Sequence, residues 1–176
     1  MNTEIFTIGH STHPIDEFIH ILLNYGIERI VDVRTIPKSR YNPQFNQDAL
    51  QEELQKHDIE YIHLAGLGGL RHSTKDSINM AWKNASFRGF ADYMQTPEFT
   101  KGLEELIELA KEKRVAIMCA EAVPWRCHRS LIGDALLVRE IKVEDILSEQ
   151  SSQPHKLTPF AKVEGERVTY PKEGEE

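Results

Sequence analysis

The chain has 176 residues, of which 40% are hydrophobic and 28% are charged, the composition of an ordinary globular protein. Its formal net charge of -7 argues against sequence-independent binding to long nucleic acid, because such binding needs a basic face. No apolar run approaches the ~20 residues that cross a bilayer, and the N-terminus lacks a signal-peptide pattern. We therefore expect one cytoplasmic domain over residues 1–176, with reduced cysteines, no membrane partner and a disordered tail from residue 171.

Apolar runs alternate with helical patterns along the chain. The predicted strands cover residues 5–8, 30–33, 61–64, 115–118 and 142–146, and the predicted helices cover 14–26, 47–57, 96–113 and a segment from Ser130. Residues 72–86 predict a loop or a short helical excursion, residues 148–155 a linker, and residues 161–170 a hairpin. This order predicts an α/β fold with three layers: a mainly parallel sheet with helices on both faces, and a small C-terminal β hairpin.

Polar and reactive side chains follow the first four predicted strands. His10 and Ser11 follow the first, Arg34 the second, and Cys119 with Glu121 the fourth, while a glycine-rich turn leads from the third strand to Arg71. The carboxyl ends of parallel strands meet at one edge of the sheet, where α/β proteins bind ligands. We therefore expect one pocket lined by His10, Arg34, Cys119, Glu121 and either His128 or Arg129.

The segment CAEAVPWRCHR, residues 119–129, concentrates the chemistry of the chain, because it contains both cysteines, a glutamate, a histidine and two arginines. A cysteine at a strand end followed by an arginine and a helix is the layout of phosphatase and rhodanese loops. The phosphatase signature has five residues between cysteine and arginine, however, whereas six separate Cys119 from Arg126. Cys119, Cys127 and His128 also have poor spacing for a zinc site, so we expect no metal and no cofactor.

Three function classes are compatible with this segment. The first is an enzyme that acts on a small anionic or nucleotide-like substrate at the carboxyl edge of the sheet. The second is a non-catalytic module that binds a nucleotide or a nucleic-acid end, and the third is a thiol-based redox sensor that uses Cys119 and Cys127. The sequence predicts no oligomeric state.

For the enzyme, the sequence suggests a hydrolase or transferase acting at a glycosidic or phosphoester bond. The expected catalytic residues are Glu121, Cys119, His10 and His128, and the expected substrate-binding residues are Ser11, Arg34, Arg40, Arg71, Cys127 and Arg129. Glu121 is narrowly favoured over Cys119 as the reactive group, on the assumption that it is partly buried beside an arginine. The anion would be held by Arg34, Arg129 and the N–H groups of the helix that starts near His128.

Six segments in a fixed order resemble the bacterial and archaeal family known as domain of unknown function 488. They are TIGHS, DVRTIPKSRYNPQF, YIHLAGLGG, SFRGFADYM, CAEAVPWRCHRSLI and HKLTPFAKV, and they extend from residue 5 to about residue 170. The resemblance implies a cytoplasmic α/β domain. It marks as signature positions Gly9, His10, Ser11, Asp32, Arg34, Ser39, Arg40, Cys119, Glu121, Cys127, His128 and Arg129. It supports the location of a site and implies no reaction.

Overall fold

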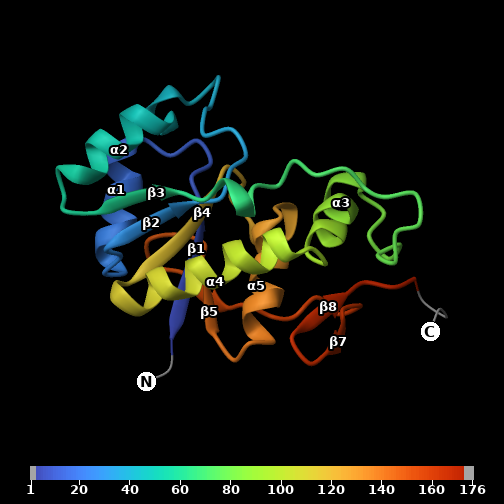
Figure 1. The fold of residues 1–176 in the computed structure, drawn as a ribbon. Helices are drawn as coiled ribbons and strands as arrows, with labels where there is room; N and C mark the ends of the chain where they lie inside the picture. The colour runs from blue at the N-terminus through green and yellow to red at the C-terminus, as the bar shows by residue number, and fades with distance from the viewer. Residues whose placement is uncertain (1–2, 173–176) are drawn as a thin grey trace.

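The computed structural model describes residues 3–172, in which strands and helices alternate as expected (Figure 1). The strands are β1 (Glu4–Gly9), β2 (Arg29–Asp32), β3 (Glu60–His63), β4 (Val115–Cys119), β5 (Lys142–Ile146), β6 (Ser152–Pro154), β7 (Lys162–Glu164) and β8 (Arg167–Thr169). The α-helices are α1 (Ile15–Asn24), α2 (Gln47–Gln55), α3 (Ala85–Tyr93), α4 (Pro97–Glu112) and α5 (Arg129–Leu137). Within residues 3–172, no helix has the length and apolar character that crossing a membrane requires.

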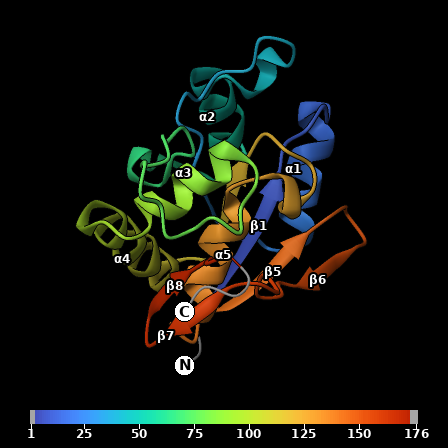
Figure 2. The ribbon, with the colours of Figure 1, turned by 90° about the vertical axis from the view of Figure 1, so that its right-hand side faces the viewer.

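Six strands form one sheet in the order β3-β2-β4-β1-β5-β6, and β7 and β8 form a separate hairpin (Figure 2). The first five strands of this order are parallel, and β6 runs antiparallel to β5. The predicted α/β fold, with its mainly parallel sheet and C-terminal hairpin, is therefore confirmed. Because β4 lies between β1 and β2, its last residue, Cys119, pairs with Gly9.

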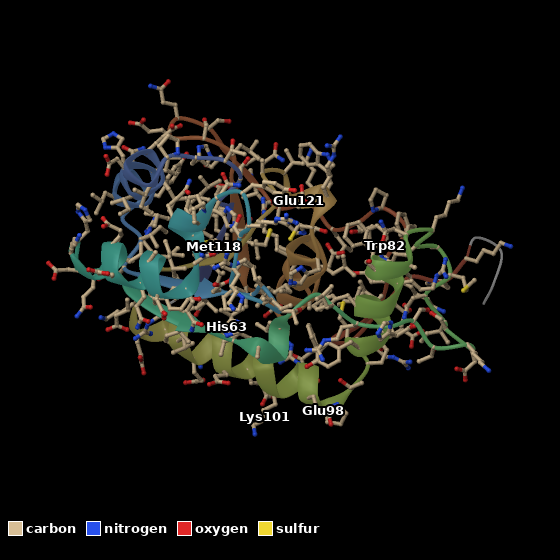
Figure 3. The ribbon with its side chains drawn as sticks, turned by 90° about the horizontal axis from the view of Figure 1, so that it is seen from above. His63, Trp82, Glu98, Lys101, Met118 and Glu121 are labelled. Atoms are coloured by element: carbon tan, nitrogen blue, oxygen red, sulfur yellow. The ribbon has the colours of Figure 1, made fainter. Side chains whose placement is uncertain are left out.

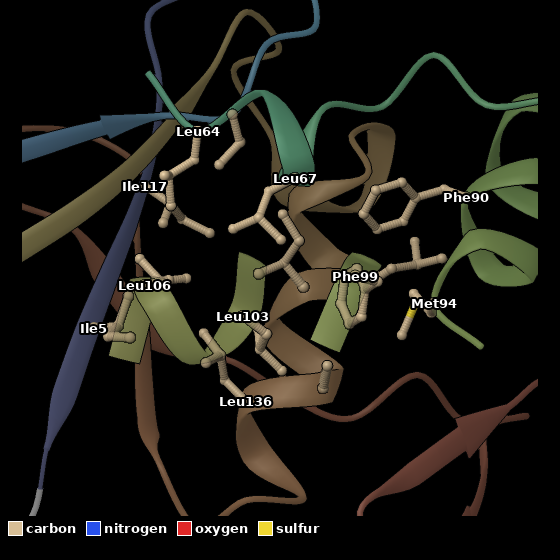
Figure 4. Close-up of a cluster of buried hydrophobic side chains, with 14 of the residues drawn as sticks. Ile5, Leu64, Leu67, Phe90, Met94, Phe99, Leu103, Leu106, Ile117 and Leu136 are labelled. Atoms are coloured by element: carbon tan, nitrogen blue, oxygen red, sulfur yellow. The ribbon is translucent and has the colours of Figure 1, made fainter. Parts of the chain in front are cut away.

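Helices cover both faces of the sheet and bury two separate apolar clusters. On one face, Phe18 of α1 and Leu54 of α2 belong to the same buried cluster. On the other, Leu106 of α4 and Leu136 of α5 pack with Ile117 of β4 (Figure 4). These helices form because their apolar residues recur every three or four positions, which gives each helix one face that leaves water when it packs on the sheet.

Two elements differ from the sequence-based expectation. The predicted linker over 148–155 contains β6, an edge strand whose polar residues show no alternation of apolar and polar side chains. The predicted loop over 72–86 ends in the cap of α3, where the Asn84 side chain accepts hydrogen bonds from the N–H groups of Ser86 and Phe87. The tail predicted over 171–176 lies, from residue 173 onward, outside the described residues.

Candidate functional site

A pocket of about 330 Å³ lies at the carboxyl ends of β2 and β4. Its lining residues come from the end of β4, from the loops after β2, β3 and β4, and from the starts of α3 and α5: Arg34, Thr35, Ile36, Lys38, Gly69, Leu70, Ser86, Phe87, Cys119, Ala120, Glu121, Arg126, Cys127 and His128. Figure 3 shows the molecule from above, with Met118 of β4 and Glu121 of the following loop labelled. A larger hollow, beside the start of β3, contains none of the predicted site residues. The carboxyl-edge pocket is therefore the candidate site.

Cys119, the last residue of β4, lies in this pocket beside a buried positive charge. Its Sγ is 2.7 Å from Nη1 of Arg129, a side chain with no exposed surface. Burial alone would raise the pKa of Cys119, but a hydrogen bond with Cys127 and the Arg129 guanidinium outweigh burial and lower this pKa to about 7. The pKa of Cys127 is raised well above its ordinary value, by burial and by the neighbouring Cys119. Cys119 therefore carries a large thiolate fraction at neutral pH.

Arg129 lies beneath the loop that follows β4 and does not line the pocket. Its Nη1 donates to the Glu121 carbonyl oxygen, and its Nη2 donates to the Ala122 carbonyl oxygen at 3.1 Å. From the other side, the N–H groups of His10 and Ser11 donate to the carbonyl oxygens of Cys119 and Ala120. The hydrogen bonds of Arg129 hold the loop and the Cys119 sulfur in place, outside the pocket lining. Its expected role as an anion ligand stays a prediction.

Arg34 lines the pocket, but its charge is matched by a buried carboxylate. Its Nε and Nη2 lie 2.9 and 2.7 Å from the Asp32 carboxylate, which also accepts a hydrogen bond from the Tyr61 hydroxyl. Burial and the Asp32 charge raise the pKa of Tyr61, so the hydroxyl keeps its proton. Asp32, one of the signature positions of the family resemblance, therefore fixes the Arg34 side chain from inside the protein. It does not line the pocket itself.

The two histidines expected to act as acids use their ring N–H groups in internal hydrogen bonds. Nε2 of His128 donates to the carbonyl oxygens of Val33 and Leu67, at 2.9 and 3.0 Å. Nδ1 of His10 donates to the Ser11 carbonyl oxygen at 2.8 Å, and His10 is absent from the pocket lining. Burial lowers the pKa of both rings to about 4, so they are neutral at neutral pH and position the backbone around the site.

We expect the free energy of unfolding to fall as the pH is lowered from 6.5 towards 4, because His10 and His128 take up protons more readily in the unfolded chain. Above the unfolded pKa of 6.5 both states are neutral, and the loss begins only below it. Two such groups give a slope of up to about 2.7 kcal/mol per pH unit. Urea unfolding at several pH values measures it, and His10→Asn should remove about half of the slope. An unfolding free energy that stays constant from pH 6.5 to 4.5 would contradict the assignment.

Among the other predicted site residues, the structure brings Glu121 and Cys127 to the pocket and leaves Ser11, Arg40 and Arg71 outside its lining. Arg71 stacks over the Tyr93 ring, 3.7 Å from its centre, and donates to the Gly68 carbonyl oxygen. Glu121 is exposed, and Arg129 contacts its backbone carbonyl. The expectation of a partly buried Glu121 carboxylate paired with an arginine is therefore wrong.

Two exposed cations at the pocket, Lys38 and Arg126, were not among the predicted site residues. Within residues 3–172, the ion pairs of lysine and arginine involve other side chains, so both charges are available to a ligand. Their signal in the sequence is position alone: Lys38 follows β2 and Arg126 lies between the two cysteines. No pattern in the sequence distinguishes Lys38 and Arg126 from Arg40 and Arg129, which lie outside the pocket lining.

Comparison with known proteins identifies the family. Searches of curated proteins and of solved structures gave no significant match. The family model described as Domain of unknown function DUF488 matches residues 14–136, a range that includes β4, both cysteines and nearly all of α5. The chain therefore belongs to the DUF488 family, as the sequence resemblance indicated.

Proposed function

We propose that this protein is an enzyme in which the Cys119 thiolate attacks a small anionic substrate bound in the carboxyl-edge pocket. The observation that carries this proposal is the contact between Cys119 Sγ and Arg129 Nη1 at 2.7 Å. A thiolate is the nucleophilic form of cysteine, and a fixed positive charge beside it is the usual means of populating that form. Cys119 thus replaces Glu121 as the favoured reactive group, since Glu121 is exposed and its carboxylate is solvated.

The pocket suggests the substrate class. Lys38 and Arg126 supply positive charge, and Ile36, Leu70 and Phe87 supply apolar surface. Arginine binds phosphate and carboxylate oxygens in a bidentate manner, and an aromatic ring offers a stacking surface. A volume of about 330 Å³ is at the small end of ligand sites. We therefore infer a small phosphorylated or carboxylated molecule, including nucleotide-like ones, with an uncharged part that packs against Phe87.

The reaction would be a transfer or a hydrolysis in two steps. In the first, the Cys119 sulfur forms a bond to the electrophilic atom of the substrate, and the bond to the leaving group breaks. In the second, water or another acceptor attacks that atom and releases the Cys119 thiolate. Glu121 lines the pocket and supplies the carboxylate that would accept the proton of the attacking water.

Paired reagents test the thiolate and the anion site together. Iodoacetate and iodoacetamide deliver the same alkylating carbon, but only iodoacetate is anionic. We expect Cys119 to favour iodoacetate over iodoacetamide more strongly than free cysteine does, and Arg126→Gln to reduce this preference several-fold, on the order of 3-fold to 10-fold. Arg40→Gln is the matched control, since Arg40 is exposed but lies outside the pocket lining. Equal preference in the pocket and in free cysteine would contradict the anion site.

Measuring the turnover of a panel of small phosphate and carboxylate esters tests the roles of Cys119 and Glu121. Cys119→Ser should lower kcat by about 10³-fold or more, whereas Glu121→Gln should lower it by at most about 10²-fold. If Glu121→Gln is inactive and Cys119→Ser is active, the carboxylate carries the reaction. If phosphate or a mononucleotide stabilises the protein while no ester turns over, the binding-module class is favoured, and a ligand at 100 times its Kd would add about 2.7 kcal/mol.

A further inference from the structure

The second cysteine in the pocket has no role in the proposed attack. Cys127 precedes α5 and lines the same pocket as Cys119, and its Sγ lies 3.5 Å from Nδ1 of His128. Arg129 contacts both sulfur atoms: its Nη1 lies 2.7 Å from Sγ of Cys119, and its backbone N–H donates to Sγ of Cys127 at 3.4 Å. Both cysteines are free in this structure. A reactive thiolate therefore lies beside a protonated thiol at one pocket wall.

We propose that Cys127 is a resolving thiol, and that hydroperoxides convert the pair into a reversible Cys119–Cys127 disulfide that switches the pocket off. The proposal goes beyond the proposed function and depends on it only for the activity that is switched. Low exposure of the two residues does not prevent the reaction, because both line a pocket that a small hydroperoxide can enter. The chain supplies both partners within one loop, so neither a second copy nor a partner protein is needed.

The chemistry balances with a hydroperoxide as oxidant. The Cys119 thiolate attacks the terminal peroxide oxygen, the O–O bond breaks, and the alkoxide that leaves takes a proton from water; Cys119 becomes a sulfenic acid. The Cys127 sulfur then attacks the Cys119 sulfur, the S–O bond breaks, and the Cys127 proton leaves with the hydroxyl group as water. The two thiols have lost two electrons, which reduced the peroxide to an alcohol. A dithiol reductant returns both electrons and both protons.

Oxidation would also change the contacts of Arg129. The Nη1 group now donates to a sulfur that carries negative charge, whereas a disulfide sulfur is a weak, neutral acceptor. The nucleophile is lost, while the bonds of Arg129 to the Glu121 and Ala122 carbonyls can keep the loop in place. We therefore expect oxidation to inactivate the pocket without unfolding the protein.

The position of Arg126 makes the disulfide simple to detect. Trypsin cleaves after Arg114, Arg126 and Arg129, so Cys119 lies in the peptide 115–126 and Cys127 in the peptide 127–129. After treatment of the full chain with hydrogen peroxide, we expect these two peptides to be joined, and dithiothreitol to separate them. Labelling of Cys119 by iodoacetamide should fall about tenfold on oxidation and recover on reduction.

Variants separate this proposal from the alternatives. In Cys127→Ser, Cys119 sulfenic acid should persist, react with a cyclic 1,3-diketone, and advance to the irreversible sulfinic acid; Cys119→Ser should form neither product. Sulfenic acid on Cys119 of the unmodified protein, with Cys127 still open to alkylation, would overturn the proposal, as would a disulfide only between two copies. If the disulfide forms but Cys119→Ser keeps its turnover, the proposed enzymatic role of Cys119 fails and the resolving role of Cys127 stands.

Discussion

Replacing Gly9 by alanine is expected to lower the free energy of unfolding by about 3 kcal/mol, one of the largest effects available to a single added methyl group. A Cβ atom at this position would lie 1.5 Å from the Glu121 carbonyl oxygen and 2.7 Å from Nη1 of Arg129. Neither neighbour can yield, because the carbonyl belongs to the backbone and the guanidinium is fully buried. The loop after β4 must therefore move, and this movement would change the contact between Arg129 and the Cys119 sulfur.

Urea unfolding measures the stability of Gly9→Ala, and the pH dependence of Cys119 alkylation reports the loop. We expect the alkylation midpoint to rise from about 7 towards the ordinary thiol value, because Arg129 is displaced. Gly66→Ala is the matched control: the nearest atoms to its Cβ would be 4.0 Å away, so its stability should change by less than about 0.5 kcal/mol. Equal losses in the two variants would contradict the close contact as the cause, because the reduced flexibility of the unfolded chain would by itself stabilise both variants.

The second large effect is expected from Asp134→Asn, which removes one charge from a buried network outside the pocket lining. His155 lies between two carboxylates, with Nε2 3.1 Å from Asp134 and Nδ1 2.9 Å from Asp145. Asp134 also accepts hydrogen bonds from the hydroxyl groups of Thr158 and Tyr170. Burial lowers the pKa of His155, but the two carboxylates outweigh burial and raise it to about 9. The imidazolium therefore stabilises the fold, and the variant should lose about 3 kcal/mol.

The sign of the pH dependence makes this prediction specific. A histidine whose pKa is raised from 6.5 to about 9 on folding contributes its full stabilisation below pH 6.5 and loses it as the pH rises through 9. The difference between the original protein and Asp134→Asn should therefore shrink from pH 6.5 to 9.5. Asp76→Asn, an exposed position, is the control and should be nearly neutral. A difference that stays constant across this range would mean that packing, and not the His155 charge, explains the loss.

Much of the fold follows from the hydrophobic pattern, because the helices repeat their apolar residues every three or four positions and the buried strands are short apolar runs. The four segments that end in Gly9, Asp32, His63 and Cys119 were placed at one edge by the alternation of strands and helices alone. The β6 strand was missed because residues 152–154 are polar and pair through their backbone with β5. Its pairing depends on the neighbouring strand and leaves no pattern in its own side chains.

For the site, the sequence predicted the location better than the roles. Proximity to a strand end could not show that Arg129 turns under its loop towards the Glu121 carbonyl, while Arg126, three residues earlier, lines the pocket. The same limit applies to His128, whose ring N–H bonds to the carbonyls of Val33 and Leu67, and to His10, whose ring N–H bonds to the carbonyl of the next residue, Ser11. Which way a side chain turns at the end of a strand depends on tertiary neighbours, and those neighbours are set by the order of strands across the sheet.

That strand order has a consequence for how the molecule is made. The two neighbours of β1 in the sheet are β4 and β5, which begin at residues 115 and 142. The first strand to leave the ribosome therefore has no pairing partner until more than a hundred further residues have been synthesised. Until then, the apolar residues of β1 and the inner face of α1 have no complete sheet to cover. We expect slow folding with long-range closure as the limiting step, and a nascent chain that depends on chaperones until β4 enters between β1 and β2.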